Sequence, residues 1–352
     1  MTASGSGTAA LQPNQTVGLV CAHNHLYSSL ARGMPSPPKT PTQFIEILEQ
    51  VWWRLDCALD LDLIYWSAKL GALAALESGC TAIVDHHESP MAIDGSLSII
   101  ADACAEVGVR VNCAYGVTDR HGSEGATAGL AENERFLADG GRGMVGIHAA
   151  FTCNDETIAA AADMARRHGV GVHVHVAEGP ADTWQRLQGH TADDWWLIHG
   201  VHLPDDHGLQ GTIVHNPRSN MNNAVGYARP RRFAETGNPV SLGTDGIGSD
   251  MIDEFRVAFV RAREHDVTTT PDEIWGWLEA GRTLFPETTN DVVTWNYPVM
   301  DPWRLAYTTQ VSPTEVSIDG NVVFRDGSPT MVDAEEIIAK STEAAARLFA
   351  KL

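Results

Sequence analysis

Short apolar segments alternate with helical patterns between residues 18 and 285 of this 352-residue chain, and this alternation limits the possible folds more than any other feature. Strands joined by helical crossovers run parallel, so a parallel sheet is expected. Eight such units fit a closed (β/α)8 TIM barrel better than an open sheet. No GxGxxG turn follows the first segment, which argues against a dinucleotide-binding fold. The expected strands are 18–22, 80–85, 109–115, 144–150, 170–177, 195–201, 211–214 and 240–243.

The remaining segments carry their own local signals. Residues 27–39 contain a glycine and three prolines, which predicts a loop, whereas residues 42–60 have apolar residues at helical spacing. Two strand-like runs flank Asp319-Gly320, which is typical of a hairpin. Residues 333–352 predict a terminal amphipathic helix.

Charge and cysteine content restrict the possible partners and the location. The formal net charge of −21 argues against a nucleic-acid or anionic-membrane partner. The six cysteines lack CxxC spacing and lie mostly in apolar stretches, as expected for reduced residues of a cytoplasmic protein. Residues 1–10 lack the features of a secretory signal, and no apolar run has the length of a membrane span. We therefore expect a cytoplasmic location.

Polar side chains occur at the ends of the expected strands, where barrel enzymes build their sites. His23 and His25 stand at positions i and i+2, so both lie on one face of a strand. His175 and Asp245 end other strands, and His199 lies on a further one. Imidazole and carboxylate ligands without a thiolate suit Zn²⁺, Fe²⁺ or Mn²⁺. We therefore predict one divalent metal at His23, His25, His175 and Asp245.

Two carboxylates are candidates for proton transfer. A divalent metal lowers the pKa of its bound water toward about 7, which makes hydroxide available at neutral pH. Glu178 follows His175 by three residues and lies beyond the strand end, so it can take a proton and pass it to a leaving amine. Asp245 can bind the metal through one oxygen and accept the water's proton with the other.

Other polar and aromatic residues have structural interpretations. His173 is expected to be a satisfied interior residue rather than a ligand, and at most one of His86 and His87 points inward. The segment 215–220, with His215 and Asn220 at its ends, is either a polar turn or a group of substrate contacts. The tryptophan pairs 52–53 and 195–196 are expected to pack in the core. Five further histidines are expected on the surface: His121, His168, His190, His207 and His265.

Several of these segments together resemble the amidohydrolase superfamily. The similarity covers roughly residues 18–260, with its motifs in the family's order. It is strongest to the chlorohydrolase/aminohydrolase branch of triazine hydrolases, guanine deaminase and adenosine-type deaminases, and within that branch to the SsnA-like aminohydrolases. The motifs are GLVCAHNH at 18–25, ARGM at 31–34, DHH at 85–87, HVHVAE at 173–178, IHGVH at 198–202, HNPRSNM at 215–221 and LGTDG at 242–246.

The resemblance implies a TIM barrel with one metal, most often zinc, held by His23, His25, His175 and Asp245. It implies that Glu178 shuttles protons and that His199 polarises the attacking hydroxide. His148 resembles a substrate-binding position of the family, and Arg32, His215 and Asn220 are further predicted substrate contacts. The implied reaction is hydrolytic deamination of an N-heterocycle such as a purine, pterin, pyrimidine or triazine.

Two departures from the family pattern modify this expectation. Relatives begin with about sixty residues of strands, whereas only 17 residues precede the first expected strand here. We therefore expect a reduced β-sandwich-like element from residues 1–17 plus 286–330, beside a barrel at 18–285 and a helix at 331–352. The stretches 179–195 and 284–291 are also short, and we expect the shortened loops to open the pocket.

Three functions remain open from the sequence. The first is a deaminase, and the second is a hydrolase of the same fold that releases chloride or an alkylamine. The third is a catalytically weakened barrel that acts as a binding protein. A small-molecule substrate is expected in the first two cases, and pairing of two copies into a homodimer is expected from the resemblance alone.

Overall fold

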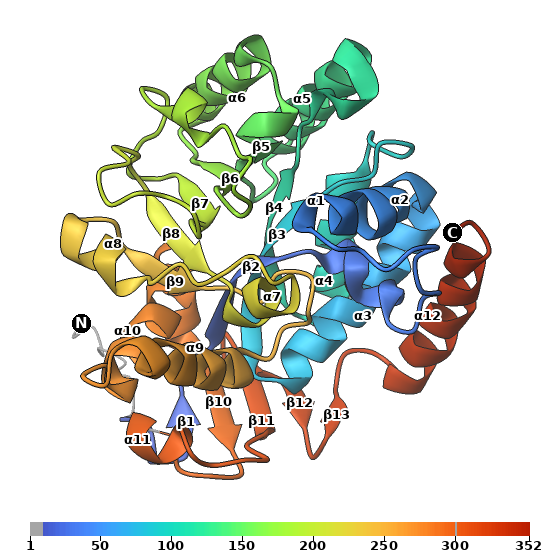
Figure 1. Cartoon of the computed structure of the whole chain (residues 1–352). Helices are drawn as coiled ribbons and strands as arrows, with labels where there is room; N and C mark the ends of the chain where they lie inside the picture. Colours follow the sequence, from blue (N-terminus) through green and yellow to red (C-terminus); the bar gives the residue numbers. More distant parts are fainter. Residues whose placement is uncertain (1–9, 300) are drawn as a thin grey trace, which may run out of the picture.

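Eight parallel strands form the centre of the molecule in the computed structural model, which describes residues 10–299 and 301–352. Figure 1 shows the strands surrounded by helices. The strands are β2 (Leu19–Asn24), β3 (Cys80–His87), β4 (Arg110–Tyr115), β5 (Val145–Ala149), β6 (Val172–Val176), β7 (Trp196–His199), β8 (Thr212–His215) and β9 (Val240–Leu242).

The eight strands close into a barrel through two weakly paired seams. β2, β3 and β4 form one hydrogen-bonded group, and β5 to β9 form the other. Isolated parallel bridges join the groups, at Cys113–Gly143 and Val117–Ile147 on one side and at Asn24–Asp245 on the other. This arrangement confirms the predicted (β/α)8 fold.

Helices cover the outside of the barrel and follow the sequence signals closely. α6 (Asp155–His168), for example, begins where the Asn154 side chain accepts a hydrogen bond from the Thr157 N–H at 2.7 Å, and it ends at Gly169, whose φ is +66°. Only the short turn η5 (Trp184–Leu187) lies between β6 and β7. The other helices around the barrel are α3 (Leu61–Glu77), α4 (Ser96–Val107), α5 (Gly122–Ala138), α7 (Pro217–Asn222), α8 (Arg231–Thr236), α9 (Met251–His265) and α10 (Pro271–Ala280).

Two separate apolar clusters stabilise the barrel. The larger one lies between the strands and the surrounding helices. The smaller one takes residues from the inward faces of several strands and fills the barrel interior. It consists of Val20, Ala22, Ala82, Val84, Ala114, Met144, Trp196, Ile198, Val214 and Phe285. The interior is therefore largely a packed apolar core, as in other barrels of this kind.

An antiparallel sheet packs beside the amino-terminal ends of the first strands. Its order is β1 (Gln15–Thr16), β10 (Val292–Trp295), β11 (Pro313–Ile318), β12 (Asn321–Arg325) and β13 (Ser328–Pro329). Gly79 lies at the start of β3 with φ +82°, and a Cβ there would come within 2.5 Å of the Trp295 ring. The sheet confirms the reduced β element of the predicted fold class. Residues 1–9, which belong to the predicted element, lie outside the described residues.

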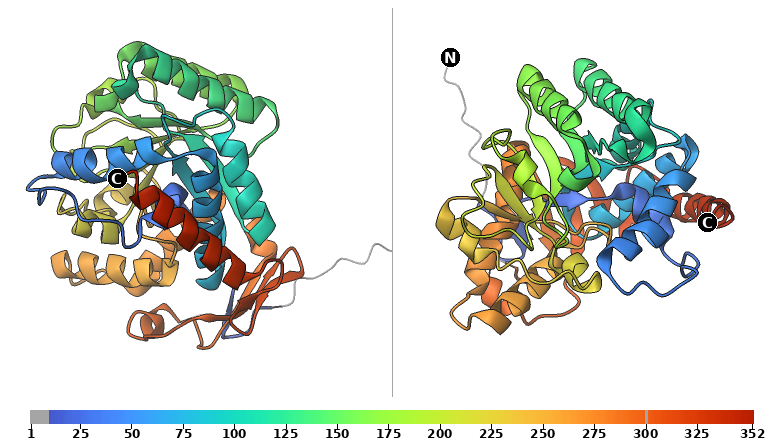
Figure 2. Two further views of the ribbon diagram at one scale, coloured as in Figure 1. Left: turned by 90° about the vertical axis from the view of Figure 1, so that its right-hand side faces the viewer. Right: turned by 45° about the horizontal axis from the view of Figure 1, so that its top comes forward.

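The last helix, α12 (Ala334–Phe349), runs along α3 (Figure 2). Its Ser341 hydroxyl lies 3.4 Å from the Trp66 carbonyl, and Arg347 pairs with Asp62 on α3. The predicted terminal helix is therefore present. Within the described residues no helix is both long and apolar enough to cross a membrane.

The segment after β2 differs from the prediction in two places. The expected loop at 27–39 begins with a 3-10 helix, η1 (Leu26–Ala31), because the Ser67 hydroxyl on α3 donates to the carbonyls of Leu26 and Tyr27. The expected single helix at 42–60 is divided into α1 (Phe44–Ile47), a π-helical turn at Leu48–Trp52 and α2 (Trp53–Ala58). Apolar periodicity records neither the contact from Ser67 nor the extra residue of a π-helical turn.

Candidate metal centre

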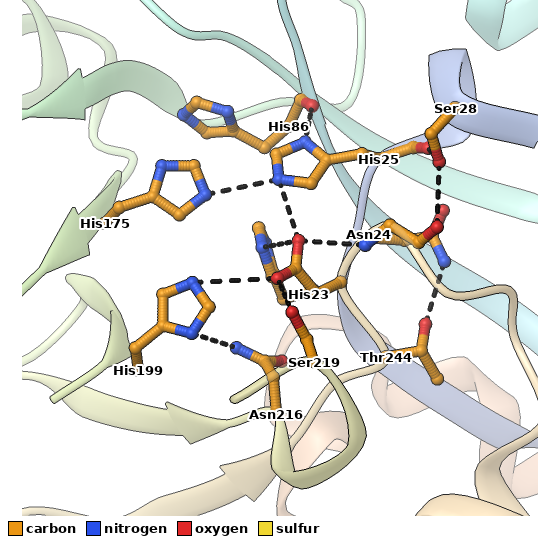
Figure 3. A network of polar contacts seen from close by, with 12 residues as sticks. His23, Asn24, His25, Ser28, His86, His175, His199, Asn216, Ser219 and Thr244 are labelled. Carbon is orange, nitrogen blue, oxygen red and sulfur yellow. Dashed lines mark hydrogen bonds and ion pairs between the residues drawn. The ribbon is translucent and has the colours of Figure 1, made fainter. Parts of the chain in front are cut away.

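Five polar side chains from four strand ends meet at the carboxyl-terminal end of the barrel (Figure 3). The Nε2 atoms of His25 and His23 lie 3.0 and 3.4 Å from Oδ1 of Asp245. Nε2 of His175 lies 3.3 Å from Nε2 of His25. Nε2 of His199 lies 3.8 Å from the second oxygen of Asp245. The predicted ligands thus come together from β2, β6 and the end of β9, with His199 from β7 beside them.

Local backbone irregularities turn these side chains inward. Val20 and Ala22 already face the barrel interior, so regular alternation would turn His23 outward. The pairing register shifts between Cys21 and Asn24, and this irregularity lets His23 join the interior group. His199 and Asp245 have φ values of +75° and +56°, which are uncommon for residues other than glycine. Such strain is typical of functional sites.

The second ring nitrogen of each histidine has its own partner. Nδ1 of His25 donates to the His86 carbonyl at 2.6 Å, and Nδ1 of His175 donates to the His148 carbonyl at 2.8 Å. Nδ1 of His23 lies 2.9 Å from Nε2 of His173. These contacts hold the rings so that Nε2 faces the centre, as in metal sites whose ligands are oriented by outer hydrogen bonds.

The donor set fits a metal ion. His23, His25 and His175 each offer a ligand atom, and so do His23, His199 and Asp245; within each group these atoms lie within 4.8 Å of one another. Nε2 of His23 and Nε2 of His199 are buried and have no hydrogen-bond partner among the described residues. Burial lowers the pKa of His23 to about 3, so this ring is neutral and able to act as a ligand.

Asp245 is ionised despite its burial. Burial opposes its charge, but the facing imidazoles of His23 and His25 favour the carboxylate and hold the pKa of this carboxyl well below its usual range. Its Oδ1 also accepts from the Gly246 N–H at 2.8 Å, and its Oδ2 accepts from the Ser219 hydroxyl. One carboxylate therefore faces both the histidines and the neighbouring loop.

Glu178 lies beside the cluster, as its position in the sequence suggested. Its Oε2 is 3.4 Å from Nε2 of His199, and burial raises the pKa of this carboxyl to about 7. A carboxyl group with a pKa near neutrality can both accept and return a proton at physiological pH. Ala177, with a φ of +48°, turns the chain just before it.

The pocket above the cluster has an aromatic wall and an acidic wall. The aromatic wall contains Trp52 and Trp53, which the sequence analysis had interpreted as packing residues; their position on the broken helix could not be read from periodicity. Other lining residues that the sequence analysis missed are Tyr27, Phe44, Leu48, Asp56, Glu88, Ala149, Phe151, Asp182 and Asn223.

The four predicted substrate contacts lie in different surroundings. His148 lines the pocket. Asn220 and His215 are buried outside the lining, where Oδ1 of Asn220 accepts from Nδ1 of His199 at 2.8 Å and the His215 ring lies 5.9 Å from that of Tyr227. Arg32 is exposed and lies near Gly248, also outside the pocket lining.

Four further histidines, His86, His87, His173 and His207, are buried. His173 is fully buried behind His23, and His86 faces inward, with its ring 4.6 Å from that of His175. His87 points elsewhere and lies 2.9 Å from the Ser89 hydroxyl. The expectation that His207 is exposed is wrong. It is 2 % exposed and accepts a hydrogen bond from the Leu209 N–H, so the loop folds over it.

Comparison with known proteins identifies similar chains. A sequence model described as "Amidohydrolase family" matches residues 16–274. A 5'-deoxyadenosine deaminase of Methanopyrus kandleri is 27% identical over 381 residues, covering 94% of this chain and 86% of the relative. An 8-oxoguanine deaminase of Pseudomonas aeruginosa is 30% identical over 308 residues, covering 75% and 68%. The crystal structure of atrazine chlorohydrolase TrzN from Arthrobacter aurescens TC1, complexed with zinc, superposes with a TM-score of 0.79 at 20% identity, covering 94% and 88%.

Proposed function

The chain belongs to the amidohydrolase family, and from this membership and the geometry of its site we propose a metal-dependent hydrolase that deaminates a small N-heterocycle. The relatives named as deaminases act on 5'-deoxyadenosine and 8-oxoguanine, which are both heterocyclic compounds. The observation that carries the proposal is the convergence of His23, His25, His175 and Asp245 with Glu178 beside them.

His23, His25, His175 and Asp245 would hold one divalent metal. Zinc is our first choice, because the structurally similar chlorohydrolase is described as complexed with zinc and the donors are nitrogen and oxygen atoms. Iron and manganese suit the same donors. When bound, the metal supplies Lewis-acid activation of water at neutral pH.

The chain's own residues would carry the protons. Deamination replaces a ring C–NH2 group with C=O, consumes one water and releases ammonia. Glu178 accepts a proton from the water and delivers it to the ring nitrogen or the departing amine. His199, held by Asn220, stabilises the attacking oxygen from the other side, and Asp245 assists as a second proton acceptor. Glu178 and Asp245 would thus supply the proton transfers that deamination requires.

Metal analysis and ammonia release test the proposal. We expect about one metal ion per chain and ammonia release from a compound in a panel of purines, pterins, pyrimidines and aminotriazines. Glu178→Gln should retain the metal while turnover falls about 10²- to 10⁴-fold, because the variant loses the proton shuttle but no ligand. Glu132→Gln is the matched control, since Glu132 is a buried glutamate outside the pocket that caps the N-terminus of α4.

The outcomes separate the three functions. Chloride or alkylamine release without ammonia would favour the second hydrolase function. Heterocycle binding without any turnover would favour a binding protein. Normal turnover by the Glu178→Gln variant would contradict the assigned role of Glu178.

We also propose a class of substrate, a cellular location and an oligomeric state for the protein. The substrate is a small molecule, as for the relatives. The net charge of −21 supports the absence of a nucleic-acid or anionic-membrane partner, and six free cysteines support a cytoplasmic location. A homodimer is proposed from the family resemblance alone, and light scattering of the purified protein tests it.

A further inference from the structure

Two buried carboxyl groups form the acidic wall of the pocket. Glu88 follows β3 and is 3 % exposed, and Asp56 on α2 is 2 % exposed. Oε1 of Glu88 and Oδ1 of Asp56 are buried and have no hydrogen-bond partner among the described residues. Nε2 of His148 lies 3.6 Å from Oε1 of Glu88, which is too long for a hydrogen bond. Buried acceptors without a partner are rare and costly, so a donor is missing from this wall.

The free oxygen of Glu88 is held in place by its surroundings. The other oxygen, Oε2, pairs with Arg120, whose guanidinium also lies 3.5 Å from Asp56 and stacks on Trp53 at 4.4 Å. A Cβ at Gly116 would come within 3.0 Å of Oε1, so the glycine leaves room for the carboxylate. Arg120 thus fixes one oxygen of Glu88, a residue of the pocket lining, and leaves the other oxygen without a partner among the described residues.

The charge of the pocket favours one class of ligand. Among the described residues that line it there is no lysine or arginine, whereas there are five carboxyl groups: Asp56, Glu88, Glu178, Asp182 and Asp245. The guanidinium nearest to this wall, that of Arg120, is already paired with Glu88 and Asp56. A ligand carboxylate or phosphate placed against this wall would therefore meet like charge, with no free guanidinium or ammonium group of the described lining residues beside it.

We infer that Glu88 determines substrate specificity: its free oxygen accepts a hydrogen bond from an N–H or O–H group of an uncharged or cationic heterocycle, and the acidic wall excludes heterocycles that carry a carboxylate or phosphate. Arg120 is the residue that positions Glu88. This inference rests on the proposed deaminase function for its substrate class, but it concerns binding and can be measured without turnover.

Matched neutral and anionic ligands test the inference on the zinc-loaded protein. The probes are adenosine against adenosine 5'-monophosphate, and pterin against pterin-6-carboxylate, with affinities from calorimetry and kcat/KM wherever ammonia is released. The wild-type protein should prefer the neutral member of at least one pair by about 100-fold or more. The inference would be overturned if, in each pair, the neutral and the anionic ligand bind equally well. It would also be overturned if none of the four ligands binds.

The Glu88→Gln variant separates recognition from a structural role. We expect weaker binding of the neutral ligand by about 10- to 100-fold and a loss of most of the preference over the anionic ligand. Glu132→Gln should leave that preference unchanged. An unchanged preference in Glu88→Gln would also overturn the inference. If this variant does not fold, the wild-type preference alone decides.

The two proposals fail in different ways. Selective binding of neutral ligands without ammonia release from any compound would contradict the proposed function and leave the role of Glu88 standing. Ammonia release that accepts anionic and neutral rings equally would contradict the role of Glu88 and leave the proposed function standing.

Discussion

Single residues at the centre of the barrel are held by contacts that a sequence does not reveal. The HxH pattern predicted that His23 and His25 lie together, and they do. The regular strand alternation assumed for them, however, is interrupted by the register shift after Cys21. His199 likewise departs from alternation through its positive φ. Residue types at strand ends therefore predicted the cluster, whereas the orientation of each ring depends on local backbone irregularities and on partners such as Asn220 and the His86 carbonyl.

The proton-transfer role of Glu178 predicts how the rate depends on pH. A carboxyl group accepts a proton only when it is ionised, and burial raises the pKa of Glu178 to about 7. Protonation below this pKa removes the acceptor, so kcat/KM should fall as the pH decreases, with a midpoint at about 7 or lower because a bound divalent cation favours the carboxylate. Initial rates of ammonia release between pH 5 and about 8 measure this limb. A rate that increases as the pH falls from 7 would contradict the assigned role.

Elements outside the barrel decide the shape of the pocket. The alternation of strands and helices predicted the barrel and most helix positions, because each unit carries its own periodicity and its own terminal glycine or cap. It did not predict the π-helical turn Leu48–Trp52, since the apolar spacing there also fits a regular helix. Phe44 on α1 and Leu48 and Trp52 on the turn line the pocket, a role that the apolar spacing alone did not indicate. The predicted domain limits at 18–285, 286–330 and 331–352 stay predictions.

The aromatic wall on this segment should contribute to substrate binding. The Trp52 ring lies against Gly246, where a Cβ would come within 2.7 Å of it, next to Asp245. Trp52→Ala removes a flat apolar surface above the site, so KM should increase about tenfold or more while the metal content stays the same. Trp66→Ala on α3 is the matched control, because Trp66 is half-buried outside the pocket lining. Equal KM values for Trp52→Ala and the wild type would show that this segment does not contact the substrate.

The whole barrel should depend on the metal for part of its stability, because the proposed ligands cross its weakest seam. Within the described part of the chain, one isolated bridge, Asn24–Asp245, and backbone hydrogen bonds from Thr244 and Asp245 to the His23 carbonyl join β2 to the chain after β9. His23, His25 and Asp245 lie on the two sides of that seam, and His175 lies across the barrel on β6. A metal bound there binds the folded state alone and stabilises it by mass action. Removal of the metal with dipicolinate should lower the Tm by about 5–10 °C, and added zinc should restore it.

The dependence of this Tm difference on pH follows from the titration of His25. Burial disfavours its charged form, but the hydrogen bond and charge of Asp245 raise the pKa of His25 to about 9 in the metal-free protein. A pKa raised on folding stabilises the metal-free protein below the unfolded value of about 6.5, and this stabilisation is lost as the pH rises toward 9. The metal must also displace that proton, so it binds more tightly as the pH rises. The Tm difference between loaded and metal-free protein, measured by calorimetry, should therefore widen from pH 6 to about 8, and a difference that narrows would place the ion away from His25.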